Sequence, residues 1–359
     1  MKKLNFAVIG AGPGGQSLAA VLTSEGHRAR LYDTDKDRIK ELQGLAGITV
    51  TGAREAVARP DRITTDLSEA MEDADVVMIV TTADAHEAVG RAIRPYLKDG
   101  QIVLLNPGQV GGALLLSAIL RSGDNPPDVV VGEALDLLYP CRLTGPGQVF
   151  HSGKKSSILI ATVPARDIDR LLAVLKPVFP SFTGAESVLY TSLDCGGAIL
   201  HVIPTLMNVN KMDRGETYDY YKEGITPHIA PLLEAADKER MAVCGALRAT
   251  LPTLAEWMID CYGLKEKELY PLIQENDAYI GVACPKSLSH RFIQEEVLTG
   301  FVPMSSLAKA LGLETPVIDS FVRLASVLTG VDYWSKGRTA EKLGLAGKTA
   351  EEIRAFLSE

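Results

Sequence analysis

Three features of this 359-residue chain have residue types and spacing suited to chemistry, and the first is a glycine-rich loop near the start. The loop is Gly10-Ala11-Gly12-Pro13-Gly14-Gly15, between an apolar run and a helical pattern. Gly10, Gly12 and Gly15 match the pattern G-x-G-x-x-G. The first glycine permits a tight turn, the second lets the backbone approach a pyrophosphate, and the third lets strand and helix pack closely. The loop therefore predicts a dinucleotide-binding site.

An acid after the second apolar run bears on which dinucleotide binds. Asp33 lies 18 positions after Gly15. A carboxylate there can bind both hydroxyls of the adenosine ribose and repels a 2′-phosphate, which favours NAD(H). Lys36 and Arg38 are the opposing observation, because nearby cations can accommodate NADP(H). A plainer interpretation makes Asp33 a turn residue, with Asp35 as the N-cap of the next helix.

Polar residues also follow later apolar runs, where ligands bind in open α/β sheets. Asn106-Pro107-Gly108-Gln109 is either a turn into a helix or a loop that brings Gln109 beside the nicotinamide and the substrate. His86 is a candidate acid or base, although a solvated histidine at a helix start is the plainer interpretation. Cys141 fits a small buried residue better than a nucleophile. The residues predicted to contact the cofactor are Gly10, Ala11, Gly12, Gly14, Gly15, Asp33, Asn106 and Pro107.

The second feature is His201, a polar ring in the otherwise apolar stretch 198–207. One interpretation is a core histidine whose nitrogens are satisfied locally. The other is a proton carrier, because imidazole titrates near neutral pH and this segment begins the helical half of the chain. Asn208 lies two helical turns further on, and Pro204 loosens the backbone between them. We therefore consider His201 a candidate catalytic residue and Asn208 a weaker candidate for substrate binding.

The third feature is the segment 290–303, which contains Arg291, Glu295 and Glu296. An arginine can clamp a substrate carboxylate in bidentate fashion, and a carboxylate can orient a histidine ring. The plainer interpretation is a surface helix in which Arg291 and Glu295 form an i,i+4 pair. His201 and Glu296 are too far apart in sequence for spacing alone to pair them.

The elements that must position these residues differ between the two halves of the chain. In the first half, short β-branched runs alternate with helical patterns, which indicates a parallel sheet of the doubly wound α/β class. The predicted strands are 4–9, 28–32, 76–81, 102–105 and 129–131, with 147–151 and 156–162 closing this half. The predicted helices are 13–25, 36–43, 84–97, 110–121 and 166–177.

From residue 185 onward the patterns are helical. The predicted helices are 187–212, 226–249, 252–262, 266–275, 302–312, 316–329 and 350–358. Thr349 and Glu352 have capping-box spacing at the start of the last one. We therefore expect a Rossmann-type nucleotide domain at 1–184, followed by an all-helical substrate domain at 185–359.

Composition excludes several classes of protein. The chain is 46% hydrophobic and 23% charged with a net charge of -8, which fits a globular protein without a basic surface for nucleic acid or anionic membranes. The apolar runs are too short to cross a membrane, because a transmembrane helix needs about 20 apolar residues. Five scattered cysteines without a CxxC pair indicate neither a disulfide framework nor a zinc site, so we expect a cytoplasmic protein without a metal.

With these motifs in order, the whole chain resembles the opine dehydrogenases, the octopine and nopaline dehydrogenase group, particularly the bacterial carboxyethyl-norvaline type. The segments that carry the resemblance are 10–15, 106–108 with 111–113, 132–133 with 141–142, 146–149, 201 with 204–206 and 208, 221 with 223–227, and 337–339 through 343–345. The resemblance implies that an amino acid and a 2-oxo acid, often pyruvate, condense to an imine that NAD(P)H reduces to a secondary-amine dicarboxylate.

The resemblance also implies roles for particular residues. The family's catalytic histidine corresponds to His201, and the acid that pairs with it falls at Glu296. The family typically has aspartate there, so the extra methylene moves the charge by about 1.5 Å if the backbone is unchanged. Arg291 corresponds to a candidate binder of substrate carboxylate, and a homodimer is expected.

Two other functions remain open at this point. A hydroxy-acid or glycerol-phosphate type dehydrogenase has a similar architecture but usually carries a catalytic lysine on the first helix of its second domain. Lys211 is near that helix, but its surroundings do not match. A non-enzymatic NAD-binding sensor would need a partner-binding or DNA-binding module, which the sequence does not show.

Overall fold

The computed structural model describes residues 2–194 and 196–358, so Cys195 lies outside the described residues. The chain divides into two compact units. The first unit comprises Met1–Gly108, Gly112–Thr191 and Leu357–Glu359, and the second comprises Gln109–Gly111 and Ser192–Phe356. The division after Thr191 lies close to the predicted domain boundary, but the sequence did not indicate that the short segment Gln109–Gly111 belongs with the second unit.

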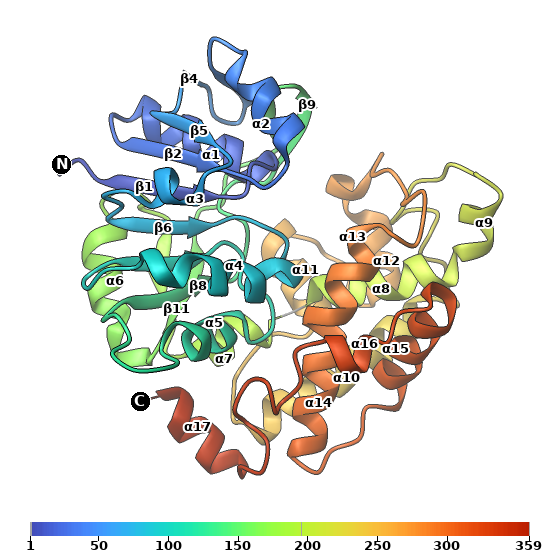
Figure 1. Ribbon diagram of the computed structural model, residues 1–359. Coiled ribbons are helices and arrows are strands. Elements are labelled where there is room, and N and C mark those ends of the chain that lie inside the picture. The colour runs from blue at the N-terminus through green and yellow to red at the C-terminus, as the bar shows by residue number, and fades with distance from the viewer. Residues whose placement is uncertain (1, 195, 359) are drawn as a thin grey trace. The chain divides into compact units, whose positions relative to one another are not determined.

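The first unit is built on an eight-stranded sheet (Figure 1). Its strands, from one edge to the other, are β12 (Phe182–Gly184), β11 (Ile158–Val163), β8 (Val130–Ala134), β7 (Ile102–Leu105), β6 (Val76–Ile79), β1 (Asn5–Ile9), β2 (Arg28–Tyr32) and β5 (Arg62–Thr64). All neighbours are parallel except β8 and β11. β6, β7 and β8 are buried along their whole length, as expected for strands covered on both faces. The predicted Rossmann-type fold is confirmed.

Helices connect these strands and pack against the sheet. They are α1 (Pro13–Ser24), α2 (Lys36–Gln43), α3 (Leu67–Met71), α4 (His86–Ile93), α5 (Gly112–Leu120), α6 (Ile168–Leu175) and α7 (Val188–Ser192), the last at the boundary between the units. Every buried residue of α5 except Ser117 is glycine or apolar, which explains its weak amphipathic pattern.

A second, four-stranded sheet lies beside α1. Its strands are β4 (Ala56–Ala58), β3 (Ile48–Gly52), β10 (Gln148–His151) and β9 (Cys141–Gly145). The His151 ring Nε2 lies 2.5 Å from the Ser17 hydroxyl oxygen and links this sheet to α1. The sequence predicted the strand at 147–151 as one that closes this half of the chain, and the structure pairs it with β3 and β9 in this second sheet.

The described part of the second unit is helical. Its helices are α8 (Gly196–Met207), α9 (Val209–Asp213), α10 (Ala230–Ala246), α11 (Leu254–Tyr262), α12 (Leu269–Glu275), α13 (Arg291–Glu296), α14 (Val302–Ala310), α15 (Pro316–Thr329), α16 (Tyr333–Lys336) and α17 (Ala350–Ser358). A π-helical turn, Val297–Phe301, joins α13 to α14. The predicted continuous helix 187–212 is wrong, because the structure divides it into α7, α8 and α9.

Local capping defines several helix starts. The Thr253 hydroxyl accepts a hydrogen bond from the Glu256 N–H, and the Glu256 carboxylate accepts one from the Thr253 N–H, which completes a capping box at α11. Thr349 and Glu352 make the same reciprocal bonds before α17, as their spacing predicted. Within the described residues, no helix has both the length and the apolar composition needed to cross a membrane.

Candidate functional site

The glycine-rich loop after β1 has the geometry that its pattern predicts. Gly10 has φ +109°, and a Cβ there would lie 2.7 Å from the Val80 carbonyl oxygen. A Cβ at Gly15 would lie 1.7 Å from the Gly10 carbonyl oxygen, so this glycine permits the close packing of α1 on β1. Gly12 is different, because a Cβ there would meet no atom within 4 Å. The open side of the loop is therefore at Gly12, where a pyrophosphate would approach.

The N-terminus of α1 is prepared for an anion. Gly12 is its N-cap and supplies no side chain, and Pro13 occupies the first turn. The N–H groups of that turn therefore have no side-chain cap and lie at the positive end of the helix dipole. This arrangement fits the phosphates of a dinucleotide.

Asp33 connects the loop to the end of β2. One of its carboxylate oxygens accepts a hydrogen bond from the Ala11 N–H at 2.6 Å and one from the Arg38 guanidinium at 3.2 Å. The other oxygen accepts a hydrogen bond from the Asp35 N–H at 3.0 Å. Asp35 in turn caps α2 through the Arg38 N–H, so the predicted N-cap is confirmed. Asp33 thus lies against the glycine loop and also holds the nearest arginine.

His201 and Glu296 meet in the second unit, although they are 95 positions apart in sequence. His201 is on α8 and Glu296 is the last residue of α13. The His201 Nδ1 lies 2.9 Å from a Glu296 carboxylate oxygen, and the two side chains are 15% and 2% exposed. A carboxylate in this position fixes the ring orientation and stabilises an imidazolium.

Aromatic rings hold the histidine in place. The Phe292 ring stacks on His201 with 3.9 Å between centroids and an interplanar angle of 5°. The Tyr221 hydroxyl lies 3.3 Å from Nε2, and the Tyr221 ring stacks on Tyr279 at 4.0 Å. Tyr221 was not among the predicted site residues, because a tyrosine in a short loop segment carries no pattern that distinguishes a functional role from a place in the core.

Pro204 explains part of the local structure around His201. A proline has no N–H, so the Leu200 carbonyl one turn earlier loses its usual helical partner. The Tyr220 hydroxyl lies 3.2 Å from this carbonyl oxygen and 2.7 Å from that of His201. The proline therefore leaves the Leu200 carbonyl as an acceptor, and the hydroxyl of the fully buried Tyr220 satisfies it beside the histidine.

The comparisons with known proteins identify the family. A family model described as the alpha-helical domain of NAD/NADP octopine/nopaline dehydrogenase matches residues 184–329, and a model for the N-terminus of NAD-dependent glycerol-3-phosphate dehydrogenase matches residues 5–122. The chain is 40% identical over 351 residues to an opine dehydrogenase from Arthrobacter sp. (strain 1C), and the match covers 98% of each chain. The chain belongs to the opine dehydrogenase family.

Other relatives agree with this assignment. Octopine dehydrogenase from Pecten maximus is 25% identical, with 94% of each chain covered. A solved octopine dehydrogenase with NADH and L-arginine shares the fold, with a TM-score of 0.81, 23% identity and coverage of 99% and 98%. The chain is accordingly an NAD(P)H-dependent oxidoreductase acting on CH–NH groups, which reductively condenses an amino acid with a 2-oxo acid.

The family resemblance led us to expect an aspartate where this chain has Glu296. The distance of 2.9 Å shows that the longer side chain still reaches His201 Nδ1. Its second carboxylate oxygen is buried without a hydrogen-bond partner among the described residues.

Two further predicted site residues have local contacts of their own, and a third has an uncommon backbone conformation. Arg291 forms the i,i+4 pair with Glu295 at 3.3 Å, yet its side chain is 54% exposed. The Asn208 side-chain amide donates to the carbonyls of Pro204 and Gly224, both at 2.8 Å, so both of its N–H groups bind backbone. Gln109 is half-buried and has φ 57°, in the left-handed region.

The remaining candidates at the sheet are mainly structural. The buried Asn106 side chain donates to the Asp136 carbonyl and accepts from the Leu138 N–H, both at 3.1 Å. His86 is fully buried, so its interpretation as a solvated histidine is wrong. Burial raises the pKa of the Cys141 thiol to about 11, which argues against a nucleophile. The described residues contain no group of three or more potential metal ligands.

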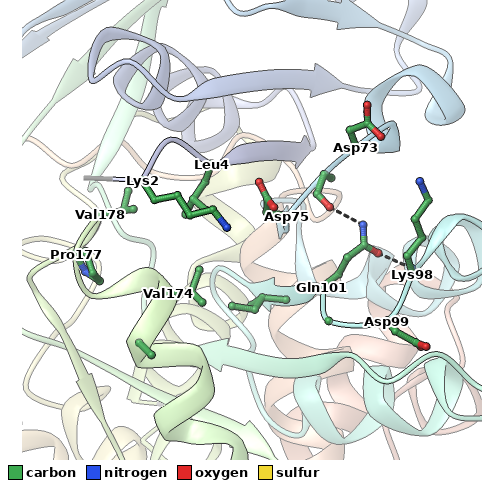
Figure 2. Close-up of a pocket in the computed structure, with 14 residues that line it drawn as sticks. Lys2, Leu4, Asp73, Asp75, Lys98, Asp99, Gln101, Val174, Pro177 and Val178 are labelled. Atoms are coloured by element: carbon green, nitrogen blue, oxygen red, sulfur yellow. Dashed lines mark hydrogen bonds between the residues drawn. The ribbon is translucent and has the colours of Figure 1, made fainter.

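A cavity of about 490 Å³ lies elsewhere in the first unit (Figure 2). It is lined by residues near the amino ends of β1, β6 and β7, including Leu4, Asp75 and Gln101. Gln101 spans part of it through hydrogen bonds to the Ala74 carbonyl and the Lys98 N–H. The glycine loop follows the carboxyl end of β1, whereas this cavity lies at the amino ends of the strands. None of the predicted site residues lines it.

Proposed function

We propose that His201 and Glu296 form the proton-transfer pair of this opine dehydrogenase, with pyruvate as the 2-oxo acid. The observation that carries the proposal is the contact of 2.9 Å between His201 Nδ1 and the buried Glu296 carboxylate. This contact leaves Nε2 as the ring nitrogen that exchanges a proton.

The first step prepares the amine. His201 accepts a proton from the ammonium group of the amino acid, and Glu296 stabilises the resulting imidazolium. The neutral amine attacks the carbonyl carbon of the oxo acid, and loss of water gives the imine. NADH, when bound, would supply the hydride that reduces the former keto carbon. The His201 imidazolium returns its proton to the imine nitrogen, so that the product is a neutral secondary-amine dicarboxylate and the histidine is ready for the next turnover.

The residues of the first unit that fit the cofactor are the glycine loop and Asp33. Gly12 leaves open space beside the uncapped start of α1, which suits a pyrophosphate. Asp33 would accept hydrogen bonds from the ribose hydroxyls and repel a 2′-phosphate, so NADH would be preferred over NADPH. Arg38 already pairs with Asp33 and is therefore less available to a 2′-phosphate.

Two side chains are proposed to bind substrate. Arg291 has an exposed guanidinium at the start of α13, where it would pair with a carboxylate. Gln109 has a half-buried side chain that would donate to the oxo acid. We do not assign this role to Asn208, because the backbone uses both of its N–H groups. A cytoplasmic homodimer is proposed from the family resemblance.

The hydroxy-acid alternative is less well supported. α8 carries a histidine paired with an acid, and the Lys211 ammonium on α9 lies over the Tyr218 ring at 4.7 Å. The family model that matches the helical half is that of the opine dehydrogenases, whereas the glycerol-3-phosphate dehydrogenase model covers only part of the nucleotide-binding half.

Two substitutions test the proposed pair. His201→Asn removes the base, and Glu296→Gln keeps the size of the acid but removes its charge. We expect kcat for NADH oxidation with pyruvate and an amino acid to fall by about 10²–10⁴ in each variant. NADH binding, measured by fluorescence titration, should remain within about twofold of the unmodified protein. Turnover of His201→Asn within a few-fold of the unmodified protein would contradict the assignment.

A further inference from the structure

Both ring nitrogens of His201 have a protein partner. Nδ1 lies 2.9 Å from Glu296, and Nε2 lies 3.3 Å from the Tyr221 hydroxyl. Phe292 covers one face of the ring at 3.9 Å. A substrate ammonium can therefore deliver a proton to Nε2 in two ways, by displacing the Tyr221 hydroxyl or by passing the proton through it.

Tyr221 is held in place by its surroundings. The residue is 8% exposed, its ring stacks on Tyr279 at 4.0 Å and 19°, and it meets Tyr220 edge-on at 4.9 Å. Moving the hydroxyl away from His201 would disrupt these aromatic contacts, which stabilise the ring in addition to its burial. The packing favours a hydroxyl that stays where it is.

The chemistry of the hydroxyl suits a proton carrier. Burial raises the pKa of Tyr221, so the phenol keeps its proton at neutral pH and has one to donate to Nε2. The nearby Arg291 guanidinium acts in the opposite direction and favours transient negative charge on the phenol oxygen. A phenol both donates and accepts, as a relay requires.

The neighbouring tyrosine shows what a purely structural hydroxyl looks like here. Tyr220 is fully buried, and its hydroxyl contacts the Thr205 hydroxyl at 2.9 Å and backbone carbonyls of α8. Among the described residues, the polar atom within hydrogen-bond distance of the Tyr221 hydroxyl is the ring nitrogen of His201. The distance of 3.3 Å between the Tyr221 hydroxyl and His201 Nε2 is typical of a catalytic hydrogen bond before substrate binds.

We propose that Tyr221 is the catalytic group that meets the amino-acid ammonium and relays its proton to His201. This inference rests on the proposed role of the His201–Glu296 pair. As an ammonium N–H bond breaks, an O–H bond forms on Tyr221. At the same time the original Tyr221 O–H bond breaks and an N–H bond forms on Nε2. The phenol ends as it began, the amine becomes neutral, and no electrons are transferred between molecules.

The test is Tyr221→Phe, which keeps the ring and removes the hydroxyl. With saturating NADH, pyruvate and amino acid, we expect kcat to fall by about 10²-fold, the lower end of the range for such groups. The KM for pyruvate and the affinity for NADH should stay within about twofold. In mixtures of H₂O and D₂O, kcat should depend non-linearly on the deuterium fraction for the unmodified protein, because two protons move together, and linearly for the variant.

Tyr220→Phe is the matched control for a structural tyrosine. It should lower the thermal unfolding midpoint, since it removes the partner of backbone carbonyls, and it should keep the non-linear isotope dependence. If Tyr221→Phe does not fold, 3-fluorotyrosine at position 221 keeps the hydroxyl and changes its acidity. An unchanged kcat in that protein would overturn the relay.

The outcomes distinguish failure of the relay from failure of the proposed opine dehydrogenase function. Amine-dependent turnover in the unmodified protein, together with Tyr221→Phe activity within about threefold of it, overturns the relay alone. Absence of amine-dependent turnover in the unmodified protein overturns both. A 10²-fold loss of kcat in Tyr221→Phe supports the relay if kcat depends linearly on the deuterium fraction in this variant and non-linearly in the unmodified protein.

Discussion

At the scale of single residues, Asp33 contacts the glycine loop and is the residue that we propose selects the cofactor. Its carboxylate binds the Ala11 N–H at 2.6 Å and the Arg38 guanidinium at 3.2 Å. Removing the carboxylate removes an acceptor for ribose hydroxyls and releases the arginine to a 2′-phosphate. Hydrogen bonds to a charged group contribute about 1.5–3 kcal/mol each.

We therefore predict that Asp33→Ala lowers the ratio of kcat/KM for NADH to that for NADPH by about 10–100-fold. The control is Asp66→Ala, which removes the N-cap of α3 and costs about 1 kcal/mol of stability without changing this ratio, because Asp66 caps α3 through the Ser68 N–H. Steady-state kinetics with the two cofactors measure it. An unchanged ratio in Asp33→Ala would mean that another residue selects the cofactor.

Some site residues could be predicted from the sequence and one could not. His201 and the glycines carry a pattern, an isolated polar ring or a fixed spacing, that has a chemical reason. Glu296 was reached through family resemblance, since sequence spacing does not pair residues 95 positions apart. Tyr221 lies in a segment that carries the resemblance, but a role beside His201 needed the structure, because the distance between them is visible only there.

At the scale of elements, two glycines of the same loop have opposite functions. Gly15 lies at the contact of α1 with β1, where an added Cβ would come 1.7 Å from a backbone oxygen. Gly12 faces open space. The first is therefore needed for packing, and the second is the one that we propose leaves space for the cofactor.

Gly15→Ala is expected to destabilise the protein by about 3 kcal/mol or more, because backbone on both sides must move. Gly12→Ala should change stability by less than about 1 kcal/mol but weaken NADH binding at least about tenfold, since its methyl group occupies the open side of the loop. Chemical denaturation and fluorescence titration measure the two effects. A Gly12→Ala protein with unaltered NADH affinity would contradict the position we assign to the pyrophosphate.

Elements with long apolar runs or strong periodicity were predicted well, and short ones were not. β2, β7, α2 and α15 have the predicted bounds. β3 and β4 were missed, because they are short and partly exposed and lack a continuous apolar run. α13, which carries Glu296, has six residues, too few for a helical period to show.

At the scale of the whole molecule, buried histidines make stability depend on pH. Burial is the main cause that lowers the pKa of His27, His151 and His290. His27 is buried and its ring accepts the Leu4 N–H at 3.2 Å, an interaction that needs a neutral Nδ1. Because the unfolded chain binds these protons more readily, their contribution is present above about pH 6.5 and is lost as pH falls below it.

The free energy of unfolding is accordingly expected to decrease between pH 7 and pH 5. His27→Gln should make this decrease smaller, whereas His228→Gln, at an exposed position, should leave it unchanged. Denaturant titrations at several pH values check the prediction. If the free energy of unfolding of His27→Gln decreases with falling pH as steeply as that of the unmodified protein, other groups cause the pH dependence.

The sequence pattern changes near residue 184, and this change predicted two domains. The pattern gave no sign that a short segment of the first half would belong with the second unit. Gln109–Gly111 belongs with the second unit. The Val110 N–H donates to the Thr299 carbonyl, and the Arg338 guanidinium donates to the Val110 carbonyl, both at 3.1 Å. Partners so distant in sequence leave no local pattern, so only the three-dimensional structure reveals them.

The most direct test of the proposed function is NADH oxidation with pyruvate, measured with and without a panel of amino acids, with mass spectrometry of the product. The proposed function predicts oxidation that requires the amine and a product whose mass equals that of a carboxyethyl amino acid. Oxidation with pyruvate alone, giving a hydroxy acid, would contradict it.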